Sequence, residues 1–208
     1  MGKMNKTHQD LSFLDQSRSS HERNPVNPHP PIPELVGKLL LADPSLRDGT
    51  FNKAVLLLGE YSAEEGAFGL ILNQPTGQTV GNLLNKKDFS ALASVAVHHG
   101  GPVAREHLTF AAFWEKDDAF DFAIRISAEE AAAYVRLPGT IVRAFVGYSG
   151  WEKDQLEGEM DRESWATLDP NPQLLTAVHD ITLWKKLMSN ISPYHRLLAN
   201  APAEVMAN

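Results

Sequence analysis

The stretch from residue 140 to residue 159, TIVRAFVGYSGWEKDQLEGE, constrains the fold of this chain more than any other. It begins with an apolar, β-prone run at 141–146, reaches two glycines within 147–150, and continues into helix-forming residues from 155 onward. This order predicts a strand, a tight turn and the start of a helix. Many proteins place a functional group at such a corner, which makes it the first candidate for a site.

The composition is that of a globular, acidic protein. Apolar residues make up 43% and charged residues 22%, which excludes global disorder. The net charge of −7 comes without any basic patch, so direct DNA binding is not expected. The absence of cysteine excludes disulfides and thiolate ligands. No apolar run is long enough for a membrane span and no signal-peptide core is present, so we expect a cytoplasmic protein.

The chain divides into a tail and one domain. Residues 1–33 are predicted to be a flexible, Pro-rich N-terminal extension, because five of the nine residues at 25–33 are proline. A short apolar cluster in this tail, Leu11, Phe13 and Leu14, could dock on the body or on a partner. Residues 34–208 are predicted to form a single domain.

Apolar runs bounded by turn residues predict more strands than helices. The expected strands are 37–42, 54–58, 68–72, 94–98, 107–114, 119–126, 141–146 and 164–168. A helical turn is expected at 81–84 and helices at 127–136 and 180–188. Ser127 and Glu130 have capping-box spacing, and the later helix should carry Ile181, Trp184, Leu187 and Met188 on one face. Strands that follow one another directly predict an α+β fold with a largely antiparallel sheet.

Three glycine- or proline-containing corners each follow an apolar strand: 73–75, 99–102 and 147–151. If the strands are neighbours, these corners meet at one edge of the sheet and form a cleft, although such residues also make ordinary turns. The Gly-Gly pair in the second corner could present backbone N–H groups to an anion. The predicted ligand-binding residues are Asn73, Pro75, His99, Gly100, Gly101, Tyr148, Gly150 and Trp151.

Neither a catalytic residue nor a metal site is assigned. Ser149 resembles the serine of a nucleophile elbow, but the required glycine two residues later is replaced by Trp151, so close packing explains a small residue better. His98 and His99 should point to opposite faces of a strand, which disfavours binding one metal. HExxH, Walker and GxGxxG motifs are absent, and no cofactor is expected.

Six acidic residues stand against two basic ones between 151 and 163. A solvated acidic face near a helix start is the simpler interpretation, and an electronegative cleft rim is the alternative. Trp151, Trp165 and Trp184 are expected to be core or lid aromatics rather than ligand-stacking rings.

Several motifs occur together in one order along the chain: Gly37–Leu40, Phe68–Pro75, His99–Val103 and Gly147–Trp151, followed by Gln155, Leu156, Glu157 and Glu159. This combination closely resembles the AlgH/YqgE family of bacterial proteins, often labelled as transcriptional regulators, over about residues 34–190. The resemblance implies a cytoplasmic, single α+β domain with a strongly bent and bulged sheet. Asp154 stands where the family usually has glycine, and Ser149 where alanine is common.

These observations favour a binding or regulatory module whose cleft holds a small anionic ligand or a protein partner. An enzyme acting on a nucleotide or another anionic small molecule is the alternative, and it would require polar groups such as His99, Asn73 or Tyr148 to converge on one pocket. A regulator of transcription would act indirectly, because no helix-turn-helix is evident and the charge is acidic. The sequence does not define the oligomeric state.

Overall fold

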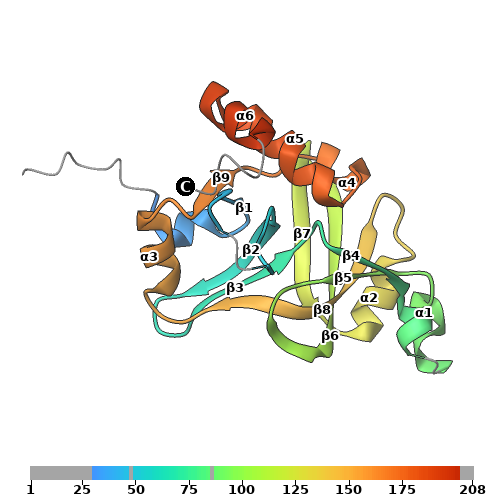
Figure 1. The fold of residues 1–208 in the computed structure, drawn as a ribbon. Helices are drawn as coiled ribbons and strands as arrows, with labels where there is room; N and C mark the ends of the chain where they lie inside the picture. The colour runs from blue at the N-terminus through green and yellow to red at the C-terminus, as the bar shows by residue number, and fades with distance from the viewer. Residues whose placement is uncertain (1–29, 47–48, 85–86, 202–208) are drawn as a thin grey trace, which may run out of the picture.

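A computed structural model describes residues 30–46, 49–84 and 87–201 (Figure 1). The strands are β1 (Leu39–Ala42), β2 (Val55–Ser62), β3 (Gly66–Ile71), β4 (Pro75–Thr79), β5 (Ala96–His99), β6 (Val103–Lys116), β7 (Ala119–Ile126), β8 (Ile141–Trp151) and β9 (Trp165–Leu168). The helices are α1 (Val80–Leu83), α2 (Ala128–Tyr134), α3 (Gln155–Asp161), α4 (Gln173–Thr176), α5 (Ile181–Ile191) and α6 (Pro193–Asn200), with 3₁₀ turns η1 (Ile32–Leu35) and η2 (Lys87–Leu92).

The strands form one sheet in the order β4-β5-β8-β3-β2-β1-β9, with β6 also paired to β8 and β7 paired to β6. Every pairing is antiparallel except that of β5 with β8. The prediction of a single α+β domain with a bent, bulged and largely antiparallel sheet is confirmed. None of the helices in the described part of the chain is long and apolar enough to cross a membrane.

β8 belongs to two arms of this sheet, and it runs as one long curved strand in Figure 1. Its first part, 141–146, pairs with β5 and β6, and its last part, 149–151, pairs with β3. We call the β4–β7 side the first arm and the side formed by β1–β3 and β9 the second arm. The predicted turn at 147–150 is therefore wrong, because neighbouring strands hold this segment extended up to Trp151.

Gly147 makes this continuation possible. Its φ of +69° interrupts the extended backbone of β8, and the register with β6 shifts at the same place through a bulge whose extra residues lie in β6, between Val103 and Leu108. Side chains alternate between the faces of a regular strand, but the left-handed residue at this bulge changes the alternation in β8. As a result Phe145 and Tyr148 both contact the inner core, the buried cluster around Leu57 and Trp184. Trp151 instead belongs to a second buried cluster with Leu40, Leu56 and Trp165, which we call the outer core.

The inner core lies between the two arms and beneath α5. It contains Leu41, Leu57, Phe113, Phe145 and Trp184. β7 packs over β2 so closely that a Cβ on Gly59 would overlap the side chain of Ile124. The sheet is therefore curled back on itself around this core.

The predicted elements differ from the observed ones in places where the sequence signal is weak. The capping box of Ser127 and Glu130 is confirmed at the start of α2. On the expected apolar face of α5, Trp184 and Met188 are buried, whereas Ile181 is 56% exposed because it is the first residue of the helix. Leu183, which was not assigned to this face, is also buried. β4, α4 and α6 were not predicted, because they are short and largely polar.

Most of the predicted extension, residues 1–29 with the Leu11, Phe13 and Leu14 cluster, lies outside the described residues. Ile32 belongs to the described part, in η1, and it is buried in the outer core with Leu35.

Gly147→Ala should destabilise the fold far more than Gly139→Ala. Both glycines have positive φ, +69° and +78°, so each substitution carries the cost of a left-handed conformation, about 1–2 kcal/mol. A Cβ at Gly147 would also lie 2.6 Å from the Gly101 oxygen, whereas nothing lies within 4 Å of a Cβ at Gly139. We expect a loss of about 3 kcal/mol or more at Gly147 in urea unfolding. Equal losses at the two positions would contradict the packing described for β8.

Candidate functional site

The three predicted corners do meet, and they meet through their backbones. The His99 N–H donates to the Gln74 carbonyl at 2.8 Å, which joins the first corner to the second. The Gly100 N–H donates to Val146 at 2.9 Å, and the Gly100 carbonyl accepts from Ile71 at 3.0 Å. The end of β5 is thereby wedged between β3 and β8, at the point where the two arms separate.

Close packing fills the space at this junction. A Cβ on Gly100 would overlap the Gly147 carbonyl, and one on Gly101 would overlap the backbone of Tyr148. The fully buried Ser149 hydroxyl donates to the Gly100 carbonyl at 3.1 Å. Because the Gly100 N–H is already bonded within the sheet, that amide does not face an open anion site. Ser149 therefore has the packing role that its sequence context favoured.

Asn73 holds the first corner rather than lining an open surface. Its side chain is 2% exposed. Its Oδ1 accepts from the Val55 N–H at 2.8 Å, and its Nδ2 donates to the Lys53 and Asp180 carbonyls at 2.9 and 3.3 Å. One amide thus ties the end of β3 to the start of β2 and to the start of α5. Pro75, in contrast, is exposed at the beginning of β4.

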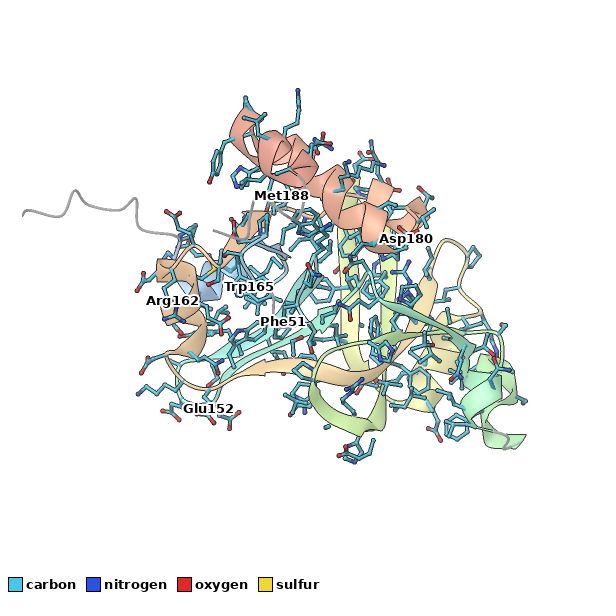
Figure 2. The ribbon with its side chains drawn as sticks, viewed as in Figure 1. Phe51, Glu152, Arg162, Trp165, Asp180 and Met188 are labelled. Atoms are coloured by element: carbon cyan, nitrogen blue, oxygen red, sulfur yellow. The ribbon has the colours of Figure 1, made fainter. Side chains whose placement is uncertain are left out.

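The tryptophans near the third corner are core residues, as expected. The indoles of Trp151 and Trp165 both donate to the same Glu159 oxygen at 2.8 Å. Figure 2 shows Trp165 beside Phe51, and their ring centroids lie 5.5 Å apart. The acidic run contributes internal acceptors in this way, since Glu157 also accepts from the Tyr61 hydroxyl at 2.8 Å.

An open hollow of about 490 Å³ lies next to the third corner, and we call it the aromatic groove. It is lined by Glu60, Tyr61, Ser62, Glu65, Gly66, Ala67, Phe68, Ala104, His107, Thr109, Arg125 and Tyr148. The curl of the sheet produces it, because the β2–β3 hairpin faces β6 and β7 there. Of the predicted ligand-binding residues, Tyr148 lines this groove, and a Cβ on Gly150 would lie 3.1 Å from the Tyr148 ring.

An aromatic pair forms part of the groove wall. The rings of Phe68 and Tyr148 are tilted by 30° with centroids 5.0 Å apart. The Arg125 guanidinium lies 5.3 Å from the Phe68 centroid and donates to Glu60 at 3.0 Å. Arg125 and Ala104, which also lines the groove, have φ values of +54° and +49°. Non-glycine residues in this conformation are strained and are concentrated at functional sites.

A second polar cluster lies inside the first arm, beneath α4. Arg143 donates through Nη1 to Nδ1 of His179 at 2.6 Å. The other His179 nitrogen donates to the Leu174 carbonyl at 2.7 Å, which leaves Nδ1 as an acceptor. The sequence analysis missed both residues, although an arginine within the apolar run 141–146 was a usable signal.

Burial controls the protonation of this cluster. Burial, together with the charge of Arg143, lowers the pKa of His179 to about 4 and that of His98 to about 3. Burial also lowers the pKa of Arg143 to about 10, which leaves the guanidinium charged at neutral pH. In the described ranges, no group of three or more His, Cys, Asp or Glu side chains is arranged to hold a metal ion.

The stability of the protein should fall as the pH is lowered from about 6.5 towards 4. The folded pKa values of His98 and His179 lie below their ordinary value of 6.5, so the unfolded chain binds protons first. Their contribution is complete above pH 6.5 and is lost as the pH falls through the folded pKa values. Each histidine should cost about 1.4 kcal/mol per pH unit in this window.

Urea unfolding of His179→Leu between pH 7 and pH 4 would test this expectation. The slope of unfolding free energy against pH should decrease by about one proton relative to the wild type. His107→Leu is the matched control, because it makes the same substitution at an exposed histidine. An unchanged slope in His179→Leu would contradict the buried, neutral state of this histidine.

Comparison with known proteins identifies the family of this chain. A family described as AlgH-like matches residues 39–195. Two relatives named UPF0301 protein are 30% identical over 189 residues, in Cytophaga hutchinsonii, and 31% identical over 182 residues, in Chlorobium limicola. The alignments cover 83% and 80% of this chain and 98% and 91% of the relatives.

Two solved structures share the fold. A protein of Corynebacterium diphtheriae aligns with a TM-score of 0.62, covering 85% of this chain and 95% of its own. The AlgH protein from Pseudomonas aeruginosa aligns with a TM-score of 0.56, covering 81% and 95%. Each is 22% identical to this chain. The chain, with this family match over most of its length, belongs to the AlgH-like family.

Proposed function

We propose that this protein is a small-ligand-binding module and that the ligand occupies the aromatic groove. The observation that carries this proposal is the Phe68–Tyr148 ring pair with Arg125 above it, at the wall of an open hollow of about 490 Å³. Ligand pockets in proteins commonly measure about 300–1,000 Å³ and combine aromatic walls with a few fixed polar groups.

The groove favours a flat ring as the bound group. Aromatic faces attract other rings by offset stacking and attract cations through their π electrons. The strained backbone at Arg125 supports the same conclusion, because the bulge it creates in β7 places the guanidinium above Phe68. A fixed cation over a fixed ring is a preorganised surface rather than a flexible one.

The charge around the groove selects among flat ligands. Glu60 is engaged with Arg125, which leaves Glu65 and His107 as the other titratable groups apart from two tyrosines. With histidine counted as neutral, two carboxylates and one guanidinium give the lining a formal net charge of −1. We infer that an uncharged or cationic ring binds here and that an anionic one is disfavoured.

Binding is better supported than turnover. The serine considered as a nucleophile, Ser149, is fully buried against Gly100. The histidines with strongly lowered pKa values, His98 and His179, do not line the groove. The groove residues come from β2, β3, β6, β7 and β8, so a bound ligand would hold both arms of the sheet together. A regulatory protein needs a property that changes when its ligand binds, and this stabilisation of the two arms would be such a property.

Three compounds with the same ring and different charge would test it: nicotinate, nicotinamide and 1-methylnicotinamide. Titrations followed by ¹H–¹⁵N NMR should show binding of the neutral and cationic compounds, with shifts at Phe68, Arg125 and Tyr148. Nicotinate should bind more weakly, because the groove carries a net negative charge.

The variant Tyr148→Leu should weaken this binding about tenfold, since it removes one ring of the pair and keeps an apolar side chain. Tyr194→Leu is the matched control, because Tyr194 is 64% exposed on α6 and does not line the groove. Equal binding in both variants, or shifts confined to other surfaces, would refute the groove. A protein segment as the occupant would show itself by shifts at these residues with peptides and none with the three compounds.

A further inference from the structure

A second open hollow lies on the first arm, between the end of α2 and the short helix α4. It measures about 650 Å³ and is lined by the end of β6, the end of α2, the start of β8 and α4. The lining is mainly apolar and includes two aromatic rings and two prolines. Among the described residues that line it, Glu115 is the one with a formal charge. We call this feature the α2–α4 hollow, and its composition favours an apolar occupant over a charged one.

Two stacked rings form a wall of the α2–α4 hollow. Trp114 at the end of β6 and Tyr134 at the end of α2 have ring centroids 5.4 Å apart and an angle of 17° between their planes. Both residues are half-buried and pack against the buried cluster that contains Phe110 and Ala131. Leu137, which also lines the hollow, is 52% exposed. The wall is therefore apolar, held in place by the core and accessible from outside.

Trp114 differs from the other tryptophans in its indole N–H. Trp151, Trp165 and Trp184 donate theirs to acceptors inside the protein at 2.8, 2.8 and 2.9 Å. In the part of the chain that the structure describes, neither the Trp114 N–H nor the Tyr134 hydroxyl has a hydrogen-bond partner. The aromatic wall therefore offers two donors to an acceptor that enters the hollow.

Aromatic walls with an available indole donor are suited to proline-rich segments. Such segments favour the polyproline II conformation, which has no internal hydrogen bonds and leaves the backbone carbonyls without partners. Aromatic-lined grooves bind them, because proline rings pack on flat aromatic faces and the segment is already extended. An indole N–H at the same place can donate to one of the carbonyls. The α2–α4 hollow combines these features.

This chain contains such a segment immediately before its first described residue. Residues 25–28, PVNP, have the spacing PxxP. Residues 25–29 lie outside the described part of the chain, which begins at Pro30. Pro31 has a φ of −51° and a ψ of 139°, in the polyproline II region, and Ile32 is buried in the outer core. The chain therefore enters the domain at a fixed point and in the conformation that aromatic grooves bind.

The segment is too short to reach the hollow of its own molecule. Pro25 is five residues from Pro30, which allows a span of at most about 18 Å. η1 packs on the outer face of the second arm, whereas the hollow belongs to the first arm, and the inner core lies between the arms. Layers of this kind are about 10 Å apart, so even a straight line through the protein measures about 20 Å, and a path around its surface is longer. Figure 1 shows η1 in blue beside α3, with β1 and β2 between it and the region of α2 and α4.

We propose that the α2–α4 hollow binds residues 25–28 of a second copy of this chain. The rings of Pro25 and Pro28 would pack on Trp114 and Tyr134, and the Trp114 N–H would donate to a carbonyl of the segment. A two-fold axis between the copies would let each segment enter the hollow of the other, so the exchange closes at a dimer. The hollow shares no lining residue with the aromatic groove, so the exchange does not depend on the proposed ligand.

Sedimentation equilibrium of the full chain would test the exchange. The wild type should form a dimer as its concentration rises. Pro25→Ala/Pro28→Ala should raise the Kd of the dimer at least about tenfold, the loss expected when anchors are removed from an interface. Leu137→Asp should weaken the dimer in the same way from the side of the hollow. Leu197→Asp is its matched control, because Leu197 is 73% exposed on α6 and does not line the hollow.

NMR of the indole N–H groups would locate the contact. The Trp114 resonance should shift as the protein concentration rises, while those of the other three tryptophans, which are bonded inside the protein, should not. A peptide of residues 22–31 added to the Pro25→Ala/Pro28→Ala variant should restore this shift. The same peptide with alanine at positions 25 and 28 should not.

The exchange is wrong if the wild type stays monomeric, or if the double variant dimerises as strongly as the wild type. A Trp114 resonance that differs between these two proteins without depending on concentration would place the segment in the hollow of its own molecule. A response of Trp114 to decaproline without a response to the peptide would assign the hollow to a different proline-rich partner. Either of these two results would also overturn the exchange between copies.

Discussion

The rest of the structure depends on the contact between the backbones of Gly100–Gly101 and Gly147–Ser149. Side chains larger than hydrogen at these glycines would overlap the opposite backbone, so the end of β5 can enter between β3 and β8 only here. The wedge separates the two arms of the sheet while β8 continues through both. Because the arms separate, the sheet curls back on itself. The curled sheet encloses the inner core on one side of Gly147 and leaves the aromatic groove open on the other side.

This arrangement explains how one strand serves two different environments. Before the bulge, Arg143 and Phe145 point into the inner core beneath α4 and α5. After the bulge, Tyr148 reaches the same face of the sheet but at the open end between β3, β6 and β7. A regular strand would have directed Tyr148 to the opposite face, and the aromatic pair with Phe68 would not form.

The sequence predicted the elements well and the site less well, for physical reasons. Apolar runs and caps depend on local chemistry, so strands such as β2 and the start of α2 were found. The meeting of the three corners was also predicted, but whether a corner is open or filled depends on long-range packing. His179 lies 36 residues from Arg143 in sequence and pairs with it only because α4 folds back over β8. Spacing alone does not reveal such a pair.

The aromatic groove contains an arginine that stability alone does not explain. A glycine at position 125 would adopt the left-handed conformation without strain. Arg125 instead holds a strained backbone and a position over Phe68, and Ala104 on the same groove is strained in the same way. Local rules are broken in natural proteins chiefly where function requires it, and here two such breaks line one hollow.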